Sequence, residues 1–278
     1  MRKAHARRLG DTAVILGLVV FTAWTLLPVL WLMISTLYEQ RAMISSPPDL
    51  SFANLTMANL SGIWNNAGFL RGLGNSLIVA GFSTGVALAL GAPAAYALAR
   101  LGVARAEAIS LVILATQMVP GIAISIPLFI AISSLGLIDS KAMLIVVYLS
   151  FNLPIVIWIL RGFFAGLPPG LERAAAIDGA GPVRTFVSII LPISMPPLCA
   201  AAIFAFIEAW NEFFFALILT RQTSQTIPLV IGQFAGQYMT AFGQMMSAAA
   251  VSCLPVILLA VLGRNYIVRG FSDGIVKG

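Results

Sequence analysis

The chain has 278 residues, of which 60% are hydrophobic and only 9% are charged, and its mean hydropathy is +0.98. A soluble domain carries nearer a quarter of charged residues, so this composition excludes an ordinary soluble globule. The net charge of +6 comes from scattered basic residues. The basic residues form no run interleaved with aromatic residues, which argues against nucleic-acid binding. A basic excess is instead typical of the loops of membrane proteins.

Six segments are apolar over enough residues to cross, or nearly cross, a bilayer as helices, which takes roughly 20 residues each. Continuous apolarity favours helices over barrel strands, which would alternate over about 10 residues. The first segment is too long for a cleaved signal peptide. We therefore predict an all-α polytopic membrane protein with a single transmembrane domain over residues 1–278. Its spans lie at about 13–37, 75–99, 108–131, 142–160, 197–219 and 248–266.

The basic residues predict the orientation of these spans. With the N-terminus inside, the inner segments hold twelve of the sixteen Lys and Arg residues, and the outer segments hold four. The four outer ones are Arg41, Arg71, Lys141 and Arg221. Basic residues concentrate in cytoplasmic loops, so both termini are expected in the cytoplasm.

Motifs for metal or nucleotide chemistry are missing from the sequence. Cys199 and Cys253 lie in or beside apolar segments, and His5 is the only histidine, which argues against a structural zinc site. The three lysines, Lys3, Lys141 and Lys277, do not follow a glycine-rich turn, so the chain cannot form a P-loop. We expect no metal and no enzymatic activity in this chain, and any ATP would be hydrolysed by a partner.

The inner segment 161–196 is far longer than a connection needs to be. Its part 171–178 is rich in alanine and favours a helix, which Gly179 and Gly181 should end. Pro182 suits the first turn of a second helix. The sequence thus predicts two short helices with a surface of small residues that another protein can approach closely. The alternative is a helical hairpin lying on the inner leaflet, although alanine is a poor lipid anchor.

The same segment carries a spaced motif. It resembles the EAA motif of the cytoplasmic loop of binding-protein-dependent ABC importer permeases, written E-A-A-x3-G-x9-I-x-L-P. Arg173 stands where the pattern has glutamate, and Glu172 lies one residue earlier. The motif positions fall on Arg173, Ala174, Ala175, Gly179, Ile189, Leu191 and Pro192.

Shorter motifs extend the resemblance to the maltose-permease-like carbohydrate branch of that family, over roughly residues 75–278. They are Asn75-Ser76-Leu77, the run from Ala95 to Arg100, Met118 to Gly121, Ile126-Pro127-Leu128, Asn152-Leu153-Pro154, Trp210-Asn211 and the tail from Arg269 to Gly278.

The resemblance implies the fold of a type I ABC importer permease, which moves a di- or oligosaccharide or polyol by alternating access. It implies a second homologous permease, an ATPase dimer that binds ATP and Mg, and an extracytoplasmic solute-binding protein, in a bacterial or archaeal cytoplasmic membrane. This chain itself would bind no cofactor. The loop would be a coupling helix seated in the ATPase, through Glu172, Arg173, Ala174, Ala175, Asp178, Gly179 and Ala180.

Two charged residues lie inside the predicted fifth span. Glu208 and Glu212 are spaced i, i+4 and would share one helix face, close to Trp210 and Asn211. Carboxylate, amide and indole groups together suit a polyhydroxylated solute. A buried network with the partner permease, or a proton relay, would also explain two intramembrane acids.

Two amides are weaker candidates for the same pathway. Gln117 and Asn152 lie in predicted spans, and each can instead form a hydrogen bond between helices.

Two other classes of function fit the sequence less well. An ion-coupled secondary transporter would call for more spans or an inverted repeat, and it would leave the Gly179 loop unexplained. A membrane enzyme would need a catalytic constellation, which the sequence does not offer.

Overall fold

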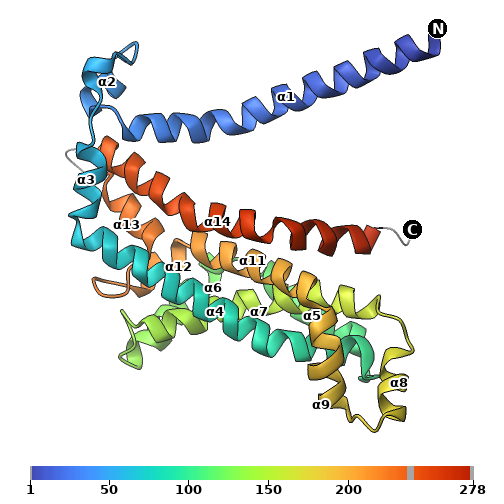
Figure 1. Cartoon of the computed structure of the whole chain (residues 1–278). Coiled ribbons are helices and arrows are strands. Elements are labelled where there is room, and N and C mark those ends of the chain that lie inside the picture. Colours follow the sequence, from blue (N-terminus) through green and yellow to red (C-terminus); the bar gives the residue numbers. More distant parts are fainter. Residues whose placement is uncertain (1, 237–240, 276–278) are drawn as a thin grey trace. The chain divides into compact units, whose positions relative to one another are not determined.

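The computed structural model describes residues 2–236 and 241–275, and over these residues it is helical without any β-strand. The chain divides into two compact units. The first comprises Met1–Phe69 and Ile231–Cys253, and the second comprises Leu70–Val230 and Leu254–Gly278. Figure 1 labels most of the helices of both units.

The first unit contains the longest of the described helices, followed by short helices. The apolar side chains of this helix are exposed from Val14 to Trp31, with Trp24 78% exposed, as expected for a helix that lipid covers. At the end of this helix, the carbonyl oxygens of Thr36 and Tyr38 accept hydrogen bonds from the side-chain amide of Asn59, at 3.2 and 2.8 Å. The elements are α1 (Arg2–Thr36), α2 (Gln40–Ile44), η1 (Phe52–Asn54), α3 (Ala58–Trp64) and the start of α14 (Phe242–Ile275).

The second unit holds most of the remaining helices. They are α4 (Ala67–Arg100), α5 (Ala106–Ala115), η2 (Thr116–Met118), α6 (Gly121–Ser134), α7 (Lys141–Ala165), α8 (Leu171–Ile177), α9 (Pro182–Thr185), the π-helix η3 (Phe186–Ile190), α10 (Leu191–Ile193), α11 (Met195–Asn211), α12 (Phe214–Leu219) and α13 (Ile227–Gln233).

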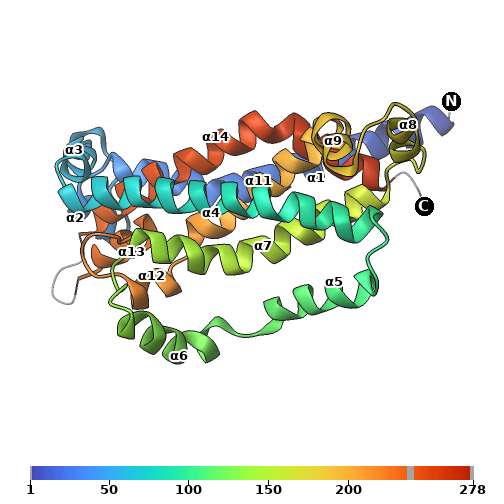
Figure 2. The same ribbon diagram turned by 90° about the horizontal axis from the view of Figure 1, so that it is seen from below.

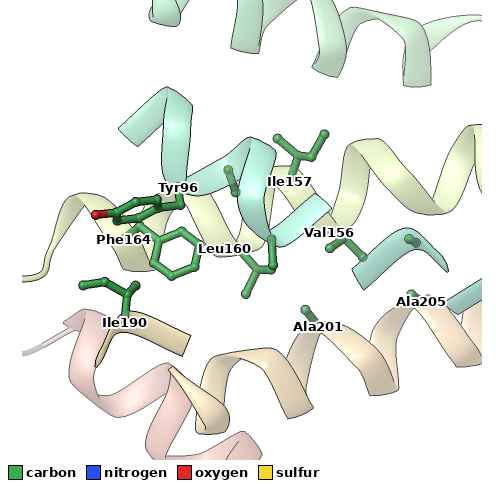
Figure 3. Packing of buried hydrophobic residues seen from close by; sticks show 11 residues of the cluster. Tyr96, Val156, Ile157, Leu160, Phe164, Ile190, Ala201 and Ala205 are labelled. Atoms are coloured by element: carbon green, nitrogen blue, oxygen red, sulfur yellow. The ribbon is translucent and has the colours of Figure 1, made fainter. Parts of the chain in front are cut away.

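The core of the second unit forms where α4, α7, η3 and α11 meet (Figure 3). Small residues let these helices approach closely, as is common in membrane helix pairs. Gly91 shows how closely, because a Cβ there would lie 2.7 Å from Val156 Cγ1. The buried cluster consists of Ala87, Ala92, Ala95, Tyr96, Val156, Ile157, Leu160, Phe164, Ile190, Ala201 and Ala205.

The predicted third span is not one continuous helix. Helices α5 and α6 are bent by 87° relative to each other, and a short extended segment joins η2 to α6 (Figure 2). Pro120 explains the break, since proline lacks an N–H and forces the preceding residue out of the helical region. Val119 is accordingly extended, at ψ 117°.

The predicted fifth span is also interrupted. Helix α11 ends at Asn211, and α12 begins at Phe214. Glu212 is extended, at ψ 122°, so the i, i+4 geometry predicted for Glu208 and Glu212 on one continuous helix is wrong.

Among the residues that the structure describes, four helices are long and apolar enough to cross a membrane. Two bent pairs pass the same test together, namely α5 with α6, and the segment Pro182–Ile193 with α11, bent by 79°. Counting each pair as one span brings the number to six. Helix α13 is seven residues long and therefore too short to span a bilayer.

The carboxylate of Asp139, just before the start of α7, holds a loop at the end of the second unit that lies far from α8. Asp139 has φ 64° and accepts hydrogen bonds from the main-chain N–H groups of four consecutive residues, Arg221 to Ser224, at 2.9–3.2 Å. The hydroxyls of Thr223 and Ser224 donate to it as well. Burial alone would raise the pKa of Asp139, but these donors lower it well below the usual range.

Two residues near the start of α4 also form hydrogen bonds with the loop that follows α12. The Asn75 amide donates to the carbonyl oxygens of Thr223 and Gln225, both at 2.9 Å. The Ser76 hydroxyl accepts from the N–H of Ile227 at 2.7 Å. The Asn75-Ser76 motif therefore positions a loop 150 residues away in the sequence.

Candidate functional site

Helices α8 and α9 form a short hairpin, as the sequence predicted. Gly179 has φ 76°, a conformation that side chains other than glycine adopt at a cost. The N–H of Gly179 donates to Ala176 (3.1 Å) and that of Ala180 to Ala175 (2.9 Å). This pair of bonds is a Schellman motif, which satisfies carbonyl groups at the end of α8. Pro182 then opens α9 at its first turn.

The surface of this hairpin is apolar at its tip. Ile177 is 87% exposed and Val183 is 77% exposed, and a charged residue follows each, Asp178 and Arg184. Large apolar side chains this exposed at the end of a folded hairpin are typical of a surface that another molecule covers.

The predicted coupling residues divide into two groups. Arg173, Ala174, Asp178 and Gly179 are exposed, and Ala180 is half-buried. Ala175 is 2% exposed and faces the body of the unit, so it belongs to the packing of α8 rather than to its outer surface. Glu172 also contributes little to that surface, because its carboxylate pairs with Arg100 inside the chain.

The Glu172 pair has the geometry of a double hydrogen bond. Arg100 Nε donates to Glu172 Oε1 and Arg100 Nη2 to Glu172 Oε2, both at 2.7 Å. The hydrogen bond from Arg100 lowers the pKa of Glu172, so the carboxylate stays ionised at pH values where a free glutamate would take up a proton.

The second arm of the hairpin leads into the core. Ile190, at the end of η3, is fully buried against Phe164 and Tyr96 in the cluster of Figure 3. The chain then bends by 79° into α11. At the bend, the buried Ser194 hydroxyl donates to the carbonyl oxygen of Ile190 at 2.6 Å. The second arm of the hairpin is therefore joined directly to the start of α11.

The predicted pathway residues on α11 differ in exposure. Glu208 and Asn211 are exposed, and among the residues described, none forms a hydrogen bond with the Glu208 carboxylate. Trp210 is 3% exposed, and its ring stacks on Phe206 at 5.5 Å, so the structure gives it a packing role instead of a free face.

Glu212 caps the next helix. Its carboxylate accepts from the N–H groups of Phe215 (3.0 and 3.1 Å) and Ala216 (3.3 Å) at the start of α12. Such a bond satisfies N–H groups that a helix start leaves unpaired.

The two amides form hydrogen bonds between helices, which is the alternative that the sequence left open. Gln117 Nε2 donates to the carbonyl oxygen of Phe151 at 2.6 Å. Asn152 is fully buried, and its Nδ2 donates to Ser83 Oγ at 3.3 Å. These bonds connect η2 with α7 and α7 with α4, and the pathway role of both amides stays a prediction.

Sequence reasoning missed three residues that shape this unit. Ile177 and Val183 carry the exposed tip, and the apolar residue after three alanines was a signal for the first of them. Asp139 gave little signal, because its partners are main-chain groups.

Comparisons with known proteins agree with this architecture. The solved structure of a bacterial ABC transporter involved in the import of the acidic polysaccharide alginate is similar, with a TM-score of 0.74, 21% identity and coverage of 94% of this chain and 96% of that one. At this identity the likeness shows the fold alone.

Curated relatives are similar over nearly their full length. The trehalose/maltose transport system permease protein MalG of Thermococcus litoralis is 33% identical, over 95% of this chain and 96% of its own. The trehalose transport system permease protein SugB of Mycobacterium tuberculosis is 36% identical, over 98% and 99%. The family described as binding-protein-dependent transport system inner membrane component matches residues 87–273. With this match, these relatives and the helical fold, the chain belongs to that family of membrane permeases.

Proposed function

We propose that this chain is one permease half of an ATP-driven importer for a carbohydrate, a di- or oligosaccharide or a polyol. A second homologous permease would complete the pathway, an extracytoplasmic solute-binding protein would deliver the solute, and an ATPase dimer would bind ATP and Mg. The observation that carries the proposal is the hairpin of α8 and α9, whose exposed Ile177 and Val183 need a partner.

The hairpin would dock in a cleft of the ATPase. The apolar tip would supply buried contact area, and Arg173, Asp178 and Arg184 would lie at its rim. A membrane surface is a poorer occupant, since the exposed face of α8 also carries alanines and charged residues.

The carbohydrate class rests on the relatives. Two of them are named for trehalose or for trehalose and maltose. A third, the diacetylchitobiose uptake system permease protein NgcG of Streptomyces coelicolor, is 30% identical over 94% of this chain. Exposed Glu208 and Asn211 on α11 would donate to or accept from solute hydroxyls.

The membrane would be a bacterial or archaeal cytoplasmic membrane, with both termini inside. The distribution of basic residues supports this orientation, which would put the hairpin of α8 and α9 on the same side as the ATPase.

Reconstitution tests the proposal. The chain, its partner permease and the ATPase would be placed in liposomes, with the binding protein outside, and uptake of labelled trehalose and maltose would be measured with and without ATP. Uptake that requires both ATP and the binding protein is expected. Uptake driven by an ion gradient without ATP would favour an ion-coupled secondary transporter instead.

A further inference from the structure

One arginine at the end of α4 contacts both segments that meet at the start of α8. Besides its double bond to Glu172, Arg100 donates through Nη1 to the carbonyl oxygen of Leu167 (3.0 Å) and through Nη2 to that of Pro168 (3.1 Å). The Arg100 side chain is 12% exposed and that of Glu172 is 26% exposed. Arg100 thus fixes the end of α4 to the α7–α8 connection and to α8 itself.

An aromatic side chain one turn earlier supports this contact. Tyr96 Oη donates to Glu172 Oε1 at 3.4 Å. Its ring lies 5.7 Å from the ring of Phe164 on α7 and 5.1 Å from that of Phe186 in η3. The end of α4 therefore contacts both arms of the segment that carries the hairpin.

One residue of the exposed tip, Ile177, and one residue of the ion pair, Glu172, lie on the same short helix. Glu172 is in the first turn of α8 and Ile177 is its last residue. They are five positions apart in the sequence, which is about 7.5 Å along the helix axis. A force applied at Ile177 therefore reaches Arg100 through a single helix, and Arg100 passes it to the 34-residue helix α4.

We propose that Arg100 and Glu172 form a positioning link that transmits the movement of α8 to α4 during transport. This inference rests on the proposed function, since the movement of α8 would come from the ATPase. The planar guanidinium suits the role, because its two parallel bonds fix the angle between the helices as well as their distance. A lysine would keep the charge without fixing that angle.

The test uses the complete importer in liposomes, with three measurements: the amount of ATPase that co-purifies, the ATP hydrolysis stimulated by loaded binding protein, and the solute taken up per ATP. Arg100→Lys and Glu172→Gln leave the tip of the hairpin unchanged, so the ATPase should still co-purify. Solute per ATP should fall about fivefold or more, the low end of typical coupling energies. The double variant should be no worse than the poorer single one, because both remove the same contact.

Arg105→Lys is the matched control, since Arg105 is an exposed arginine on the connection that follows α4. It should keep the wild-type ratio. Two results would overturn the link: a wild-type ratio in both test variants, or a lower melting temperature and yield with an unchanged ratio in the complexes that do assemble, which would mean that the pair only stabilises the fold. Failure of the proposed function looks different, because the wild-type complex would then show no ATP-dependent uptake at all, and both ideas would fall.

Discussion

The carboxylate of Glu212 caps α12 through the main-chain N–H of Phe215, at 3.0 and 3.1 Å. Glu208, four residues earlier, is exposed on α11. The two acids that looked equivalent in the sequence therefore have different surroundings and should respond differently to substitution.

Replacing Glu212 should affect stability first. Glu212→Ala removes the acceptor for two N–H groups and should lower the free energy of unfolding by about 0.5–2 kcal/mol, the usual range for a lost helix cap. Glu212→Gln keeps one oxygen acceptor and should lose less. Denaturant titration of the purified complex measures both, and equal stability of Glu212→Ala and the wild type would contradict the capping role.

Replacing Glu208 should affect transport first. Glu208→Gln keeps hydrogen bonding and should reduce uptake modestly, whereas Glu208→Leu should reduce it severely while the complex still assembles and keeps its basal ATP hydrolysis. If Glu208 instead pairs with a buried arginine of the other permease, both variants should lower complex yield, since they leave a charge unpaired. Normal yield and normal uptake for Glu208→Leu would rule out both roles.

Substitutions at Gly179 can separate the effect of backbone strain from the effect of contact with a partner. Apart from the residue itself and its chain neighbours, no described residue would lie within 4 Å of a Cβ at Gly179, so the φ of 76° is what penalises a side chain there. Alanine should cost about 1–2 kcal/mol there, and asparagine less, because it tolerates that conformation. If the ATPase packs against this position, Gly179→Asn should insert normally and still lose ATPase co-purification and uptake. Wild-type uptake by Gly179→Asn would mean that no partner closes on it.

The Asp139 contacts predict a pH-dependent contribution to stability. The folded-state pKa is lowered, so the contribution is present above the ordinary value of 3.8 and is lost as the pH falls below it. Asp139→Asn should cost about 1–3 kcal/mol at neutral pH, because it removes hydrogen bonds to a charged group. The difference from wild type should shrink in acid. Asp178→Asn, at an exposed position, is the control, and a pH-independent difference would contradict this assignment.

The orientation can be checked by labelling single cysteines in a variant in which Cys199 and Cys253 are replaced by serine. Ser46→Cys lies in the first outer loop predicted by the sequence, and Ile177→Cys lies at the tip of the hairpin. An impermeant maleimide added to intact cells should label the first alone, and the second should react only after the membrane is opened. Labelling of both from outside would contradict the predicted topology.

The sequence predicted the elements whose signals are local. Alanines, Gly179 and Pro182 specify the hairpin, because helix propensity, left-handed backbone and a fixed φ each act over a few residues. The breaks at Pro120 and Glu212 were harder to predict. Proline can kink a span without ending it, and a glutamate inside an apolar run does not reveal that it will cap a new helix.

The roles of charged side chains depend on residues far away in the sequence. Glu172 was assigned to the outer surface of the hairpin because it lies next to the EAA positions, yet its partner is Arg100, 72 residues earlier. The docking role of the remaining residues stays a prediction, since it depends on a surface outside this chain.

The Asp139 contacts have a practical consequence for spectroscopy. Asp139 binds the main chain of Arg221 and Gln222 and leaves both of their side chains exposed. These two positions can therefore change identity without altering the path of the loop. A spin label or fluorophore on Arg221→Cys would sit on a fixed backbone, so that distances measured from it would report helix movement during the transport cycle instead of loop motion.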